Sequence, residues 1–272
     1  SDTLTSYQLS AVYKLTGDVN VYAAFSENDA TSNSMAGGTV LGGNNEINPL
    51  NFATENTLYE VGVKYAPNSS WYAEAAVFDQ TRSLRNRDGS NSGVKTQGFE
   101  LQMFYQADDV WINAAYSYLD ARFDDSAAFQ GTAQVIDAFD NSRPDIIEGT
   151  GVGSPSFAAF PASDSRVQGI PPQIASINAG WQITDDLQVG ASALYTKSFP
   201  LDFLQTVHIR DQYTLDVNAD YQVTDDLRLR LDIINVTDEE NCQPLFEGGY
   251  FGATLVLPNV PRHAQVTMQY AF

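Results

Sequence analysis

The chain has 272 residues and carries 14 Lys and Arg against 34 Asp and Glu, a formal net charge of −20 at pH 7. This acidity argues against a nucleic-acid-binding protein, because the phosphates of a nucleic acid require a basic surface. Aromatic residues make up 12% of the chain and charged residues only 18%, which is the opposite of the balance in disordered chains, so we expect a folded protein.

The apolar residues are too scattered for a membrane helix. No stretch of about 18 or more apolar residues occurs, whereas a membrane-spanning β-strand needs only about 10 residues of alternating polarity. The single cysteine, Cys242, excludes a disulfide within the chain and fits an oxidising compartment. The chain opens without a signal peptide, so we expect either a processed protein or a fragment.

Alternation with period 2 predicts an all-β chain of eleven strands. The clearest strand runs from Tyr213 to Val223, where apolar odd positions alternate with polar even positions. In chain order the predicted strands are 6–16, 19–29, 57–67, 71–84, 94–107, 110–123, 172–184, 187–199, 209–223, 227–239 and 260–272.

Alternation also occurs in soluble β-sandwiches, so the connections between strands decide the class. Tight turns and long loops alternate strictly along the chain. Tight turns at 17–18, 68–70, 108–109, 185–186 and 225–226 are separated by loops rich in Gly, Ser, Asn, Asp and Pro. Short periplasmic turns and longer external loops are typical of bacterial outer-membrane barrels, so we predict a transmembrane antiparallel β-barrel.

Aromatic residues collect at the ends of the predicted strands, as in the girdles of membrane barrels. The set beside the tight turns is larger than the set near the long loops. The first set is Tyr13, Tyr65, Trp71, Tyr105, Trp181, Tyr221, Tyr270 and Phe272, and the second is Phe25, Phe99, Tyr118 and Tyr195.

The number of strands indicates that the barrel needs more chain than this sequence supplies. If the tight turns are periplasmic, eleven strands begin outside the cell and end in the periplasm, whereas complete bacterial barrels have an even number of strands. An open sheet edge is not tolerated in lipid, so we expect further residues to close the barrel.

Several segments resemble the C-terminal barrel of TonB-dependent receptors, in the order in which that family has them. They are VNVYAAFSE (19–27), NPLNFATENTLYEVGVKY (48–65), AAVFDQTR (75–82), QGFELQ (97–102), YTL (213–215), INVTD (234–238), and Pro261-Arg262 leading to Phe272. The sequence Glu240-Asn241-Cys242 departs from the family pattern, which has an aromatic residue soon after its Asn-Leu-Phe-Asp element.

The resemblance implies a fold and a function. Residues 1–272 would be the C-terminal portion of a barrel of about 22 strands, plugged by an N-terminal domain. The plug, the TonB box and the N-terminal strands lie outside this sequence. Such a receptor, in the outer membrane of Gram-negative bacteria, imports a scarce nutrient such as a ferric siderophore or a vitamin.

The same resemblance implies the partners of the chain. These would be the TonB complex of the inner membrane, the plug and N-terminal half of the barrel, outer-membrane lipid, and a small-molecule or metal-chelate ligand. The alternative is a passive outer-membrane porin with fewer strands and no plug. A barrel enzyme fits less well, because the chain has only two histidines and no evident catalytic set, and a soluble β-sandwich is a further alternative.

Ligand binding is expected in the external loops, because loops on a rigid scaffold usually carry the binding contacts. Arg82, Arg85 and Arg87 cluster in an otherwise acidic chain and could attract an anionic ligand, or could simply be solvated charges that pair with Asp. Phe246, Tyr250 and Phe251 could stack on a ligand or fold their own loop inward.

The remaining candidates have mainly structural interpretations. We expect the polar side chains of 216–220 and 228–232 to line the lumen and meet the plug or water. Phe272 is expected to act as the C-terminal signal for barrel assembly. The acidic loop 124–148 is more typical of a solvated face than of a cation site, and His208 and His263 lack metal-ligand spacing. The sequence predicts no cofactor, and Cys242 is expected to be a free or buried thiol rather than a link to another chain.

Overall fold

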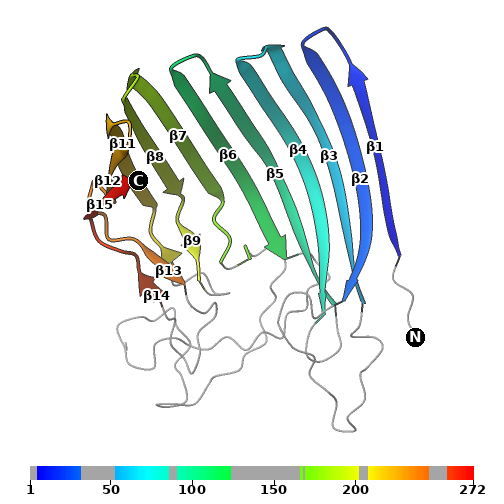
Figure 1. Cartoon of the computed structure of the whole chain (residues 1–272). Coiled ribbons are helices and arrows are strands. Elements are labelled where there is room, and N and C mark those ends of the chain that lie inside the picture. The colour runs from blue at the N-terminus through cyan, green and yellow to red at the C-terminus, as the bar shows by residue number, and fades with distance from the viewer. Residues whose placement is uncertain are drawn as a thin grey trace, which may run out of the picture.

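The computed structural model describes residues 5–31, 53–85, 91–123, 166–167, 169–201, 208–244 and 256–272 (Figure 1). Its main element is one antiparallel sheet of eleven strands, in the order β1-β2-β3-β4-β5-β6-β7-β8-β11-β12-β15. These strands are β1 (Ser6–Lys14), β2 (Val19–Thr31), β3 (Ala53–Asn68), β4 (Trp71–Arg85), β5 (Asn91–Gln106), β6 (Val110–Phe123), β7 (Gln173–Thr184), β8 (Leu187–Thr196), β11 (Gln212–Thr224), β12 (Leu227–Ile234) and β15 (His263–Tyr270).

The eleven predicted strands are confirmed as an antiparallel meander, although the bounds of most of them differ from the prediction by one to five residues. The predicted strand 227–239 ends at Ile234, because Asn235 and Asp238 adopt positive φ values of 54° and 57° and turn the chain. Four short strands outside the main sheet were not predicted. They are β9 (Phe199–Pro200), which pairs with β10 (His208–Ile209), and β13 (Cys242–Pro244), which pairs with β14 (Val256–Pro258).

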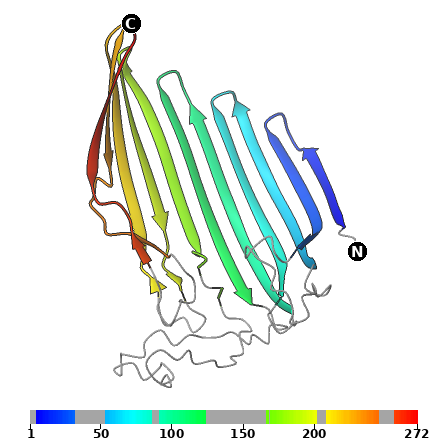
Figure 2. The ribbon, with the colours of Figure 1, turned by 60° about the horizontal axis from the view of Figure 1, so that its bottom comes forward.

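The long strands run side by side, with their tight turns at the same end of the sheet (Figures 1 and 2). The tight turns are tied together by a repeated hydrogen bond. In each case, the carbonyl oxygen of the last residue of a turn accepts a hydrogen bond from a backbone N–H farther along the chain. The donor lies near the tight-turn end of the next strand of the main sheet, which pairs with the hairpin. The pairs are Ala66 to Asp18 (2.8 Å), Gln106 to Ser70 (2.9 Å), Gln182 to Asp109 (2.7 Å), Gln222 to Asp186 (2.8 Å) and Ala271 to Asp226 (3.0 Å).

The two faces of the sheet differ in polarity because side chains alternate along each strand. On β3, Tyr59, Val61, Val63 and Tyr65 point to one face and are 58%, 56%, 36% and 47% exposed. Cross-strand pairing continues this apolar face over the sheet, for example from Val63 to Ala75 and on to Leu101. A water-soluble sheet would cover such a face, whereas in a bilayer the face contacts lipid.

The apolar band has an aromatic border at each end. All the aromatic residues expected beside the tight turns that lie within strands are on the apolar face, as the pairs Trp71 with Tyr105 and Leu227 with Tyr270 show. Toward the external end of the strands, Tyr59 of β3 contacts Phe25 of β2, and their ring centroids are 5.0 Å apart. The distance from Tyr65 to Tyr59 is six residues, or about 20 Å along the strand.

Beyond the outer aromatic residues the same face becomes charged. Asp79 follows Val77 on β4 and is bound by Lys95 at 3.2 Å and by Gln97 at 2.5 Å. Asp120 and Arg122 likewise follow Tyr118 on β6 and form an ion pair at 3.0 Å. The strands therefore continue past the lipid band into water. Among the described residues no helix is long and apolar enough to cross a membrane.

Glycines on the polar face let neighbouring side chains lie flat against the wall. Tyr22 covers Gly62, Phe78 covers Gly98, and Trp111 covers Gly180, each from the residue directly opposite on the adjacent strand. A Cβ atom at Gly98 would lie 2.3 Å from the backbone oxygen of Tyr118 and 2.7 Å from the Phe78 ring. The backbone of β6 cannot move aside without losing its pairing with β5.

We therefore expect Gly98→Ala to destabilise the barrel by about 1–3 kcal/mol, the usual cost of overpacking. The measurement is the temperature at which the full-length protein loses its heat-modifiable mobility in gel electrophoresis. Gly17→Ala is the matched control, because nothing lies within 4 Å of a Cβ atom at that turn position. Equal melting of the two variants would contradict the close approach of β6 to Gly98.

Candidate functional site: the polar wall and its external rim

The polar face of β2, β3 and β4 carries a hydrogen-bonded cluster around Glu74. Tyr22 donates from its hydroxyl to Glu74 Oε1 at 3.0 Å, and Tyr72 donates to Glu74 Oε2. Lys64 lies directly opposite Glu74, with its Nζ 3.3 Å from Oε1 and 5.0 Å from the centroid of the Tyr22 ring. The carboxylate thus has three partners, so the cluster holds the wall in shape and neutralises its own charge.

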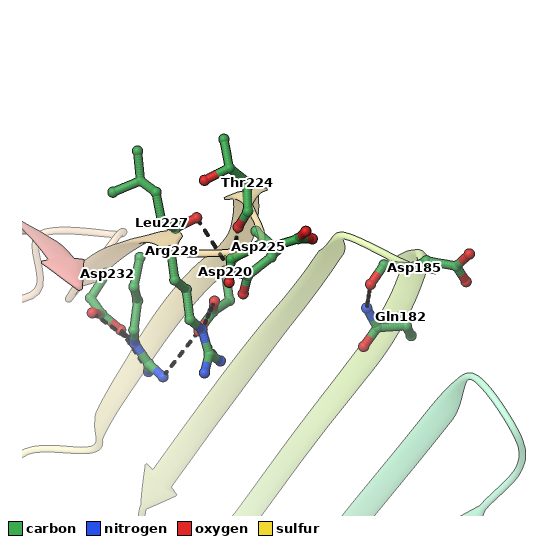
Figure 3. A network of polar contacts seen from close by, with 10 residues as sticks. Gln182, Asp185, Asp220, Thr224, Asp225, Leu227, Arg228 and Asp232 are labelled. Atoms are coloured by element: carbon green, nitrogen blue, oxygen red, sulfur yellow. Dashed lines mark hydrogen bonds and ion pairs between the residues drawn. The ribbon is translucent and has the colours of Figure 1, made fainter. Parts of the chain in front are cut away.

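A second cluster lies on the polar face of β11 and β12, near the tight turn at Asp225 and Asp226 (Figure 3). Arg228 binds Asp220 through two nitrogen atoms, one of them at 2.7 Å. Arg230 binds Asp232 at 2.8 Å and approaches Asp220 at 4.0 Å. Asp220 is only 8% exposed, and a nearly buried carboxylate needs such partners. Of the polar rows predicted at 216–220 and 228–232, Asp220 therefore binds arginines of the second row, whereas Asp216 accepts from the Asn235 amide at 2.7 Å.

Buried asparagine side chains hold the chain that follows the external end of β12, and one of them ties it to β11. Asn235 is 3% exposed; its Nδ2 donates to the carbonyl of Glu239 at 2.9 Å, and its Oδ1 accepts from the Glu239 amide at 2.9 Å. Asn241 is 6% exposed and donates to the carbonyl of Tyr213 at 2.7 Å. The segment Glu240-Asn241-Cys242, which departs from the family pattern, is thus anchored to β11.

A small apolar cluster forms outside the main sheet. Phe199, Leu201 and Ile209 are 5%, 2% and 3% exposed and pack together with the partly buried Cys242. Gln212 links this cluster to β13, since its Nε2 donates to the Cys242 carbonyl at 2.9 Å and its Oε1 accepts from the Cys242 amide at 3.2 Å. Cys242 is a free thiol in this packing. The β9–β10 and β13–β14 pairs are therefore held together as one external platform.

An exposed ion pair lies at the edge of the platform. Asp211 accepts from Lys197 Nζ at 2.8 Å, from the Ser198 amide at 2.8 Å and from the Tyr195 hydroxyl at 2.9 Å. The Lys197 ammonium, together with these other donors, lowers the pKa of Asp211 from 3.8 to about 2. The same carboxylate raises the pKa of Lys197.

The two wall clusters are built of side chains that bind one another. In the part of the chain that the structure describes, no group of three His, Cys, Asp or Glu side chains is placed to hold a metal ion. His263 lies at the start of β15 with its Nδ1 3.0 Å from the Pro261 carbonyl, and His208 lies in β10. The charged side chains of both wall clusters have hydrogen-bonding partners.

The sequence-predicted binding residues are only partly described. Arg82 lies near the external end of β4, in the alternation phase of the polar face, opposite Asn56 on β3 and Val94 on β5. Arg85 is the last residue of β4. Phe272 is exposed, and its ring centroid lies 5.6 Å from that of Tyr270. Arg87, Phe246, Tyr250 and Phe251, and the acidic loop 124–148, lie outside the described residues.

Sequence reasoning missed the cluster around Glu74 and the external platform. The only indication of the Glu74 cluster in the sequence is the alternation, which places Tyr22, Lys64 and Glu74 on the polar face. Their contact depends on the register that pairs Lys64 with Glu74 and Tyr22 with Gly62, which a single sequence does not provide.

The ion pair at Asp211 should respond to acid but not to mild pH changes. Because the pKa of Asp211 is lowered, the stabilisation is complete above its ordinary pKa of 3.8 and is lost as the pH falls through about 2. We expect ¹³C NMR of labelled Asp carboxyl groups to show one resonance titrating near pH 2, assigned by its loss in Asp211→Asn. In Lys197→Met that resonance should titrate closer to pH 3.8. An unchanged titration would show that Lys197 is not the cause.

The chain matches the family model described as "TonB dependent receptor-like, beta-barrel" over residues 1–236. No curated protein matches it in sequence. Among solved structures it resembles the siderophore receptor PiuA from Acinetobacter baumannii (TM-score 0.71, 20% identity) and the ferric-catecholate import receptor Fiu from E. coli K12 in its closed form (TM-score 0.69, 18% identity). It also resembles the ferripyoverdine receptor of Pseudomonas aeruginosa (TM-score 0.67, 17% identity).

These similarities cover 97% of this chain but only 35%, 34% and 32% of the three receptors, so the chain spans about a third of their length. The identities are low, and the likeness to these structures therefore establishes the fold. The family model adds the class, a non-enzymatic receptor of the outer membrane. The chain belongs to the family of TonB-dependent receptors and forms part of their outer-membrane β-barrel.

Proposed function

We propose that the receptor containing this chain imports a ferric siderophore, or a similar metal chelate, across the outer membrane with energy delivered through TonB. The observation that carries the proposal is a wall with an apolar outer face and a polar inner face, in a chain of this family. The structural neighbours named above are receptors for iron chelates, which supports this ligand class.

The proposed mechanism requires more chain than this wall. Strands β1 and β15 are the two edges of the sheet, and unpaired backbone groups cannot face lipid. Further strands, to a total of about 22, would close the barrel around a lumen wide enough to need a plug. In this proposal the plug rests against the polar face, whose clusters at Glu74 and Asp220 already satisfy most of their own hydrogen bonds.

Ligand capture is assigned to the external loops. Arg82, Arg85 and Arg87 would attract an anionic chelate to a chain of net charge −20, and Phe246, Tyr250 and Phe251 would stack on its aromatic groups. The loop that carries these aromatics is held at both ends, because β13 pairs with β14 and Asn259 donates its amide to Asn241 at 2.9 Å. Phe272 is assigned to barrel assembly rather than to the ligand.

The first test is the energy dependence of uptake. The full receptor would be expressed in a strain that lacks its own siderophore receptors, and uptake of ⁵⁵Fe-loaded siderophores would be followed. Uptake should fall to the background level when TonB is deleted or when an uncoupler collapses the proton gradient. Uptake that persists without TonB, together with steady conductance in planar bilayers, would favour a passive porin.

The second test concerns the three arginines. Replacing Arg82, Arg85 and Arg87 together by Gln should weaken binding of an anionic ferric tris-catecholate about tenfold, equivalent to about 1.4 kcal/mol. Binding of a neutral ferric hydroxamate is the control and should change little, because only the charge attraction is removed. Equal effects on both chelates, measured by fluorescence quenching, would contradict the electrostatic role.

A further inference from the structure

The apolar face of the sheet has a hollow that lies across β6, β7, β8, β11 and β12. This hollow, called here the alanine groove, has a volume of about 550 Å³. Its floor includes Ala179, Ala191 and Ala219, and its banks include Ile112, Trp181 and Leu231. All six side chains belong to the lipid-facing phase of their strands.

The groove follows from the cross-strand register. Ile112 pairs with Ala179, Ala179 with Ala191, Ala191 with Val217, and Val217 with Ile233, so one row has methyl groups in its middle and longer side chains at both ends. On the opposite face the same two strands pair Gly180 with Gly190. Small residues thus lie on both faces where β7 and β8 meet, and the hollow follows from the register of these strands.

The position of the groove selects the membrane leaflet. Val110, one of its lining residues, directly follows the tight turn at Asp108 and Asp109. Trp181 belongs to the aromatic border beside the tight turns, and it is 53% exposed. The tight turns are periplasmic in barrels of this kind, so the groove faces the periplasmic leaflet, whose acyl chains would cross it.

The charges at the end of the groove select the headgroup. Asp108, Asp109, Asp185 and Asp186 are exposed and form no ion pair within the described residues. The two turns are adjacent, because Gln182 of β7 donates its amide to the Asp109 carbonyl at 2.7 Å. Arg228 and Arg230 are held on the polar face by Asp220 and Asp232, so they do not offset these carboxylates.

We propose that the alanine groove binds one acyl chain of a zwitterionic aminophospholipid of the periplasmic leaflet. The ammonium headgroup would lie against the carboxylates of the two turns and the exposed ring of Trp181, which attracts cations through its face. An anionic phospholipid would be repelled by the same carboxylates. The proposal rests on the outer-membrane location of the barrel and not on the import of any ligand.

The test uses the full receptor, purified from the outer membrane, stripped of lipid in detergent, and examined by native mass spectrometry. Phosphatidylethanolamine and phosphatidylglycerol with identical acyl chains are added in equal amounts. We expect the phosphatidylethanolamine adduct to exceed the phosphatidylglycerol adduct about tenfold. Ala179→Phe, which fills the groove, should lower the phosphatidylethanolamine adduct about tenfold.

Two further variants separate the groove from the charges. Ala175→Phe is the matched control, because Ala175 lies on the same strand and the same face but does not line the groove, and it should retain lipid. Asp109→Asn combined with Asp186→Asn should abolish the preference between headgroups. Lipid retention by Ala179→Phe, or no headgroup preference in the unmodified receptor, would overturn the proposal. A dimer that Ala179→Phe disrupts would assign the groove to a second copy instead.

Discussion

The structure depends on one constraint: in hydrocarbon, each backbone N–H and C=O group needs a partner within the protein. The continuous antiparallel pairing from β1 to β15 meets this need across the wall. At the tight turns, where strand pairing ends, the carbonyl of Asp18, Ser70, Asp109, Asp186 or Asp226 accepts one further amide. Side chains of the turns help, as when Thr184 Oγ1 accepts from the Leu187 amide at 3.1 Å. The wall thus ends in ordered hairpins.

Once the backbone is paired, the environment on each side decides the side chains. Lipid contact leaves only apolar groups and aromatic borders on one face. The other face carries charge, and opposite charges pair within its two clusters, Lys64 with Glu74 and Arg228 with Asp220. Outside the bilayer water can satisfy the backbone again, and there the regular pairing gives way to the positive-φ turn at Asn235 and the small core of Phe199, Leu201 and Ile209.

Small residues connect the two faces. A glycine on the polar face lets the aromatic ring of its neighbour lie flat against the sheet, as the ring of Trp111 does over Gly180. Alanine on the lipid face lowers the outer side, as Ala179 and Ala191 do. On β7 and β8, glycines on the polar face and alanines on the lipid face occur together. These small residues shape both surfaces of one pair of strands. The shapes of the lipid-facing surface and of the polar surface are therefore determined by the same cross-strand pairs.

The sequence by itself determined the eleven long strands, their tight turns and the polarity of their faces, because alternation is a local property of each strand. It also determined the family, through motifs such as the segment 48–65. Only the tertiary structure decided that Lys64 faces Glu74, that β9, β10, β13 and β14 form, and that Cys242 packs against the small external core. These features depend on register or on strands of two or three residues, so they arise from contacts between segments far apart in the chain.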